Sequence, residues 1–139
     1  MKKTKPTAII IAEDHPLYRK ALCDLVRGNP DFDVVAETGD GRMVEALVEQ
    51  FKPGILLLDL NLPGMSGLEI AQHLRDRHPE VKIVVLTMNN DEAVFNSVID
   101  AGVSGYVLKE SAVDIILECM RAVVGGDHYI SPSLAHHLV

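Results

Sequence analysis

Polar side chains that could take part in chemistry follow four apolar runs of this chain. The carboxylates are Glu13, Asp14 and Asp59, while Thr87 supplies a hydroxyl and Lys109 an ammonium group. Each stands where a run of aliphatic residues ends, as at the end of a buried strand. Because the carboxyl ends of parallel strands meet at one edge of a sheet, we expect these five side chains to converge. Asp59 alone could equally be a turn residue, whereas five groups on four strands indicate a site.

Three carboxylates held close together repel one another unless a cation lies among them. All-oxygen ligands favour a hard ion, and few carboxylates with room for water favour Mg2+ over zinc. With Mg2+ and Lys109 nearby, Asp59 would act as a nucleophile toward phosphorus. Thr87 would donate a hydrogen bond to the phosphoryl oxygens, and the two cations would neutralise their charge. The predicted product is an aspartyl phosphate on Asp59.

A regular alternation of strands and helices must position these groups. The stretch from Gly54 to Glu69, GILLLDLNLPGMSGLE, places Asp59 directly after an apolar run that predicts a strand buried on both faces. Four more strands are predicted, at residues 7–12, 34–36, 81–86 and 104–108. A helical pattern follows each of the five strands. This order predicts an α/β fold with a doubly wound parallel sheet.

Length and composition bound the class of protein. A chain of 139 residues is long enough for one domain with a core. A net charge of -7 disfavours direct binding to nucleic acid. The apolar run before Glu13 is too short for a signal peptide, and no run reaches the roughly 18 residues of a membrane span. Cys23 and Cys119, far apart in helical patterns, predict free thiols in a reducing compartment. We therefore predict a cytoplasmic protein with no membrane contact.

The order of these motifs resembles the receiver domains of bacterial two-component response regulators. The resemblance covers about residues 7–125 and rests on Glu13-Asp14, on DLNLPGMSG from Asp59, on Thr87 and on Lys109. It implies a flavodoxin-like fold with a five-stranded parallel sheet in the order 2-1-3-4-5 and five flanking helices. It also implies a signalling module that catalyses only its own phosphorylation and autodephosphorylation.

The resemblance assigns roles within the site. It makes Asp59 the phosphoacceptor and a ligand of Mg2+, with Asp14 as a direct ligand. The backbone carbonyl of Asn61 would complete the metal site, and Glu13 would assist through water. Lys109 would act in phosphoryl transfer.

The resemblance also implies a switch. Tyr106 occupies the aromatic position whose side chain moves inward as Thr87 engages the phosphoryl group. That movement would change the surface formed by the fourth helix, the fifth strand and the fifth helix.

Partners follow from the same resemblance. A sensor histidine kinase would supply the phosphate, and phosphorylation would favour a homodimer whose interface the sequence leaves open. The tail GGDHYISPSLAHHLV is similar to the subfamily with a C-terminal LuxR-type helix-turn-helix domain. We therefore predict a receiver domain at 1–126. Residues 127–139 would be a linker and the start of a truncated helix. They would lead to an output domain that contacts DNA and controls transcription.

Two positions depart from the common family pattern. Glu13 stands where many members have aspartate, and Glu110 follows Lys109 where many have a cis proline. A cis bond without proline costs about 2.5–4 kcal/mol, so we expect a trans bond and a less constrained loop. Asn61 and Asn89 would flank the path of the attacking water and tune the lifetime of the phosphate.

Two other functions fit the sequence less well. A phosphohydrolase of the haloacid-dehalogenase type would need a second aspartate two residues after Asp59, where this chain has Asn61. Flavin or nucleotide binding would need a phosphate-cradling loop after the first strand. The segment from Glu13 to Pro16 is acidic and would repel phosphate, so the phosphorylation switch is favoured.

Overall fold

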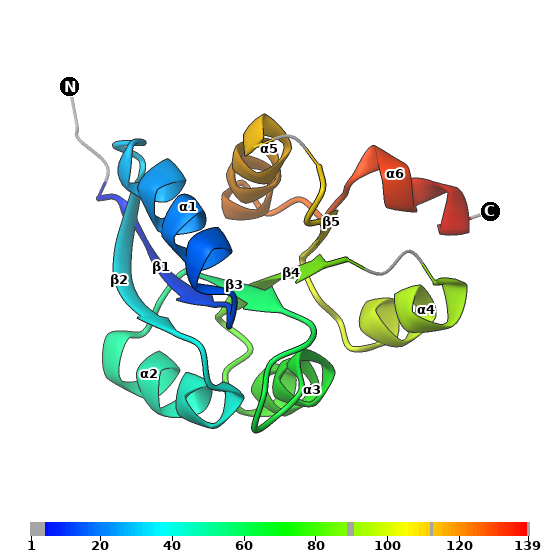
Figure 1. Ribbon diagram of the computed structural model, residues 1–139, viewed down its shortest axis with the longest axis horizontal. Coiled ribbons are helices and arrows are strands. Elements are labelled where there is room, and N and C mark those ends of the chain that lie inside the picture. The colour runs from blue at the N-terminus through cyan, green and yellow to red at the C-terminus, as the bar shows by residue number, and fades with distance from the viewer. Residues whose placement is uncertain (1–4, 89–90, 112, 139) are drawn as a thin grey trace.

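A parallel sheet of six strands forms the centre of the molecule, in the order β2-β1-β3-β4-β5-β6 (Figure 1). The computed structural model describes residues 5–88, 91–111 and 113–138. The strands are β1 (Thr7–Ala12), β2 (Phe32–Thr38), β3 (Ile55–Asp59), β4 (Lys82–Thr87), β5 (Gly105–Leu108) and β6 (Tyr129–Ile130). The parallel α/β fold predicted from the sequence is confirmed.

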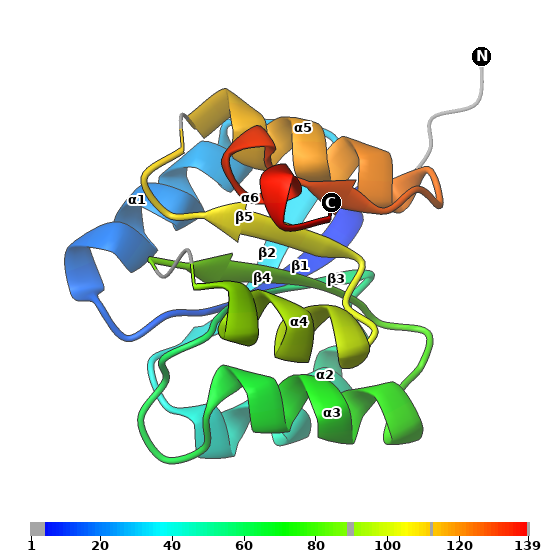
Figure 2. The same ribbon diagram turned by 90° about the vertical axis from the view of Figure 1, so that its right-hand side faces the viewer.

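Helices cover both faces of the sheet. They are α1 (Pro16–Arg27), α2 (Val44–Phe51), α3 (Gly67–Arg77), α4 (Glu92–Asp100), α5 (Val113–Val124) and α6 (Pro132–Ala135), with short 3-10 turns at Gly41–Met43 and His136–Leu138. Figure 2 shows α1 and α5 on one face and α2, α3 and α4 on the other. Among the described residues, no helix is long and apolar enough to cross a lipid bilayer.

The continuous apolar run before Asp59 is explained by this two-sided cover. All five residues of β3 are buried, because alternate side chains point to opposite faces and both faces are packed. Leu57 joins the core under α1 and α5, and Leu56 joins the core over α2, α3 and α4. Cys23 and Cys119 are buried free thiols in the first of these cores, as predicted.

The strand and helix counts correct the sequence prediction of five each. Residues 129–135, which lie in the stretch predicted as a linker and the start of a helix, form β6 and α6. The backbone N–H of Tyr129 donates to the Ser104 carbonyl (3.0 Å), and that of Ser131 donates to the Tyr106 carbonyl (2.9 Å). Leu134 is fully buried. A two-residue strand is too short to show periodicity, and it forms because the edge of β5 offers unpaired backbone groups.

Candidate functional site

Three of the five predicted side chains lie almost without solvent exposure at the carboxyl edge of the sheet. Glu13 follows β1 and is 0% exposed, Asp59 ends β3 at 1%, and Thr87 ends β4 at 0%. The Lys109 side chain follows β5 and is 8% exposed, whereas the Asp14 side chain is 34% exposed to solvent. The parallel topology thus brings five groups from four strands together, with one carboxylate accessible from solvent.

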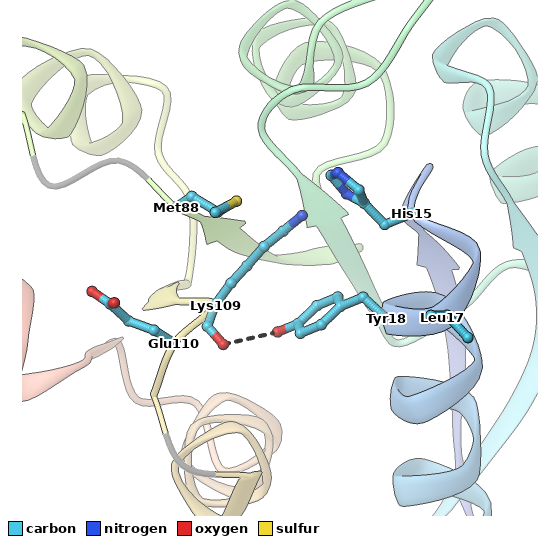
Figure 3. Close-up of a pocket in the computed structure, with 6 residues that line it drawn as sticks. All are labelled: His15, Leu17, Tyr18, Met88, Lys109 and Glu110. Carbon is cyan, nitrogen blue, oxygen red and sulfur yellow. Dashed lines mark hydrogen bonds between the residues drawn. The ribbon is translucent and has the colours of Figure 1, made fainter.

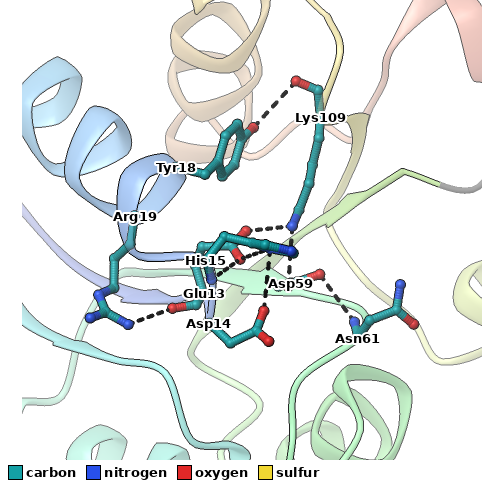
Figure 4. Close-up of polar contacts among 8 residues, drawn as sticks. All are labelled: Glu13, Asp14, His15, Tyr18, Arg19, Asp59, Asn61 and Lys109. Atoms are coloured by element: carbon teal, nitrogen blue, oxygen red, sulfur yellow. Dashed lines mark hydrogen bonds and ion pairs between the residues drawn. The ribbon is translucent and has the colours of Figure 1, made fainter.

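Lys109 bridges the acids of two strands (Figure 4). Its Nζ lies 2.5 Å from Glu13 Oε1 and 3.1 Å from Asp59 Oδ2. Burial tends to raise the pKa of Glu13, but hydrogen bonds from Lys109 and His15 outweigh it, and the pKa is lowered overall. Sequence reasoning placed Lys109 beside the phosphoryl group and missed its ion pair with Glu13.

His15 holds the opposite side of Glu13. Its backbone N–H donates to Glu13 Oε2 at 3.0 Å, and its ring Nδ1 lies 3.0 Å from the same oxygen. The same ring atom lies 3.4 Å from Asp14 Oδ1. Ligand atoms of Glu13, Asp14, His15 and Asp59 all lie within 4.8 Å of one another. The acids are therefore close enough to share one cation.

The shielded carboxylate oxygens of this cluster fit a divalent metal. Glu13 Oε1, Asp14 Oδ1 and Asp59 Oδ2 are all shielded from solvent. Lys109 approaches two of them as an ion pair, so one positive charge faces three carboxylates. Buried oxygen ligands with unmet charge suit a hard cation such as Mg2+.

The loop after β3 orients Asp59. The backbone N–H of Asn61 donates to Asp59 Oδ1 at 3.0 Å, which leaves Oδ2 facing Lys109. The start of α3 passes so close that a Cβ on Gly67 would lie 2.5 Å from the Asp59 carbonyl oxygen. Ser66 caps α3 by accepting from the Glu69 N–H. Glycine and a capping serine therefore fix the backbone that carries the carboxylate.

Arg19 supports the first acidic loop and was not singled out from the sequence. Its Nη1 donates to the Glu13 carbonyl oxygen at 2.8 Å, and its Nε donates to Glu37 Oε1 at 3.2 Å. His15 is the N-cap of α1 and Arg19 lies four residues later, so helical spacing would have placed both near the acids.

Tyr106 lies inside the molecule beneath α4. Its side chain is 0% exposed and its ring stacks on Phe95, with centroids 5.5 Å apart. Its hydroxyl is buried and has no hydrogen-bond partner among the described residues. Thr87 ends the adjacent strand, and its carbonyl accepts from the Lys109 N–H at 2.8 Å. The Lys109–Glu110 bond is trans, as predicted, and Asn89 lies outside the described residues.

Tyrosine ionisation gives a test of this packing. The pKa values of Tyr18, Tyr106 and Tyr129 are each raised to about 12, mainly by burial. Nearby carboxylates raise them further: Glu13 and Asp59 act on Tyr18, Asp91 acts on Tyr106, and Glu118 acts on Tyr129. Since these folded-state pKa values exceed the ordinary 10, the resulting stability is present below pH 10 and is lost as the pH rises through about 12. We expect phenolate absorbance to appear only near pH 12 in the folded chain. A folded protein titrating near pH 10 would contradict this.

Comparisons with known proteins agree on one family. The model of the response regulator receiver domain matches residues 9–121. The transcriptional regulatory protein DegU of Brevibacillus brevis is 37% identical over 94% of this chain and 56% of its own length. The nitrate/nitrite response regulator protein NarP of Escherichia coli K12 is 36% identical over 99% of this chain and 64% of its own length. The chain thus spans less than two thirds of these curated relatives.

Solved structures match over nearly the whole chain. A two-component response regulator of the LuxR family from Aurantimonas sp. SI85-9A1 has a TM-score of 0.90 and 31% identity, covering 96% of this chain and 95% of that one. The isolated receiver domain of RcsB from Salmonella enterica serovar Typhimurium, with the phosphomimetic BeF3-, also has a TM-score of 0.90, with 26% identity over 95% and 98% of the two chains. A further match is a structure of two RcsB dimers bound to two parallel DNAs, with 26% identity.

Proposed function

The chain belongs to the family of response regulator receiver domains, and we propose that it is a signalling switch that accepts phosphate on Asp59. One observation carries this proposal. The Asp59 carboxylate lies at the end of β3 with one oxygen on the Asn61 N–H and the other 3.1 Å from the Lys109 ammonium, beside two further carboxylates. A nucleophile, a cation for the phosphoryl oxygens and a set of metal ligands therefore share one edge.

The residues divide the transfer step among them. An oxygen of Asp59 forms a bond to phosphorus as the donor's bond breaks, which is the phosphorus–nitrogen bond when the donor is a phosphohistidine. The Lys109 ammonium neutralises charge on the phosphoryl oxygens, and the Thr87 hydroxyl donates a hydrogen bond to one of them. The Asn61 N–H holds the carboxylate in orientation throughout.

Mg2+ is the cofactor that these residues support. We assign Asp14, Asp59 and the backbone carbonyl of Asn61 as its ligands, with Glu13 acting through water. When bound, the ion would supply further charge neutralisation on the phosphoryl oxygens. The three shielded carboxylate oxygens described above, which face a single lysine ammonium, support this assignment.

The switch would act through Tyr106 on the C-terminal segment, residues 129–138. Phe95 contacts the Tyr106 ring and also the ring of His137, with centroids 5.1 Å apart in the second pair. Leu134 lies in the same core cluster as Tyr106, and Figure 2 shows α6 beside β5 between α4 and α5. A change at Thr87 and Tyr106 would therefore reach the segment that covers the α4–β5–α5 surface.

This placement suits a receiver that reports to another domain. We propose that residues 1–126 form the receiver and that 127–139 lead to an output domain that binds DNA and controls transcription. A sensor histidine kinase in the cytoplasm would supply the phosphate, and phosphorylation would favour a homodimer. The names of DegU and NarP and the RcsB dimers on DNA support this part. The module would catalyse only its own phosphorylation and autodephosphorylation.

Metal removal tests the proposed chemistry. The chain is incubated with acetyl phosphate in Mg2+ or in a chelator, and intact mass is measured. We expect one phosphoryl group per chain with Mg2+ and almost none without it, because one lysine cannot balance three carboxylates and a phosphoryl group. Restoring Mg2+ should restore labelling. Equal labelling in both conditions would refute the metal assignment, and none in either would refute the function.

A further inference from the structure

Tyr18 packs against Lys109 across a pocket beside the proposed phosphorylation site. The Lys109 Nζ lies 5.1 Å from the centroid of the Tyr18 ring, within the range of a cation–π contact. The Tyr18 hydroxyl donates a long hydrogen bond of 3.4 Å to the Lys109 carbonyl oxygen, drawn in Figure 3. The pocket has a volume of about 440 Å³ and is lined by His15, Leu17, Tyr18, Met88, Lys109 and Glu110. One side chain of α1 thus contacts both ends of Lys109.

The other contacts of the Lys109 ammonium are with charged groups of the site itself. These are Glu13 and Asp59, which the proposed function also gives to the metal and the phosphoryl group. A divalent cation among the carboxylates would weaken their attraction for Lys109 and repel its ammonium. Phosphorylation would then convert the Asp59 carboxylate into an acyl phosphate, so the negative charge that faces Lys109 would lie on the phosphoryl oxygens. The ion pairs that hold Lys109 are therefore weakest when the cation is bound and the phosphoryl group has not yet arrived.

The Tyr18 ring does not share this weakness. It carries no charge of its own to be taken up by the metal, because a phenol is neutral at neutral pH. Its negative face attracts an ammonium group whatever the carboxylates bind. Tyr18 lies in the first turn of α1, and the buried residues Leu22 and Val26 anchor α1 in the core. The ring is thus attached to a rigid element.

We propose that Tyr18 is a positioning residue that keeps the Lys109 ammonium at the site while the carboxylates bind a cation and the phosphoryl group. The inference rests on the proposed function, since it gives Lys109 its role there. It predicts two effects of opposite sign when the ring is removed. Phosphorylation slows because Lys109 leaves the site, whereas Mg2+ binds more tightly because a repelling charge has left.

The test compares variants that remove the ring with variants that keep it. Tyr18→Leu and Tyr18→Met should slow labelling by acetyl phosphate about tenfold and lower the Kd for Mg2+, measured by calorimetry. Tyr18→Phe loses only the long hydrogen bond and should stay within about twofold of wild type. Tyr18→Trp should also retain the rate. Phe51→Leu, another partly exposed aromatic residue but at the end of α2, is the matched control and should change neither quantity.

The outcomes separate this inference from the proposed function. If the ring-less variants label at the wild-type rate, or if they bind Mg2+ more weakly in proportion to slower labelling, Tyr18 has no positioning role. If wild type does not label, the proposed function fails, and tighter Mg2+ binding by Tyr18→Leu would still support the contact. Because the chain has no tryptophan, Tyr18→Trp also supplies a single tryptophan whose emission can be excited selectively. Its emission must change when Lys109→Met is added, and an unchanged spectrum would overturn the contact even if the leucine variant does not fold.

Discussion

Asp59→Asn abolishes labelling by acetyl phosphate in the presence of Mg2+, with no phosphoryl group detectable by intact mass. Asparagine keeps the size of the side chain but offers an amide in place of a nucleophilic carboxylate. It also removes the charge that faces Lys109 at 3.1 Å. The Asp59 carboxylate is buried at the end of β3 and is oriented by the Asn61 N–H, and no other carboxylate of the described residues shares that position, so no neighbour should replace it.

The matched control is Asp76→Asn on the exposed surface of α3. The Asp76 side chain is 78% exposed, and its Oδ1 forms an ion pair with Arg75 Nε at 3.8 Å, outside the site. This variant should label as wild type does, and circular dichroism should show both variants folded. Phosphate on the Asp59→Asn chain, located by peptide mapping, would move the acceptor to another residue and refute the assignment.

Leu134→Ala lowers the free energy of unfolding by about 2–5 kcal/mol, although the residue lies close to the end of the sequence. The reason is burial: Leu134 is 0% exposed and joins the core cluster that contains Phe95 and Tyr106. Truncation to alanine removes apolar surface and leaves a cavity beside β5. Urea unfolding monitored by circular dichroism measures the change.

Leu138→Ala serves as the control in the same segment. Leu138 is 62% exposed, so its truncation should change the stability by no more than about 0.5 kcal/mol. If both variants matched wild type, residues 129–138 would contribute nothing to the folded receiver. The proposed path from Tyr106 to the C-terminal segment would then lose its physical basis.

The amino-acid sequence by itself determined which groups reach the edge of the sheet. Apolar runs that end at Glu13, Asp59, Thr87 and Lys109 encode buried strands, and alternating helices force those strands to be parallel. The convergence of these side chains is a consequence of topology, so it could be predicted without coordinates. The loop from Pro63 to Gly67 could also be predicted from the sequence, because its proline and glycines are typical of a tight turn.

Only the tertiary structure decided which of these groups pair. Lys109 lies between Glu13 and Asp59, and Tyr18 lies beneath it, although 91 residues separate Tyr18 from Lys109. A local pattern cannot encode such a contact, because it depends on the distance between α1 and the end of β5 and on the reach of a long side chain.

Strand β6 was missed for a related reason. Two residues show no periodicity, and their strand exists only through pairing with β5. Sequence patterns determine which side chains reach the carboxyl edge of the sheet, whereas long-range packing determines which of them contact one another.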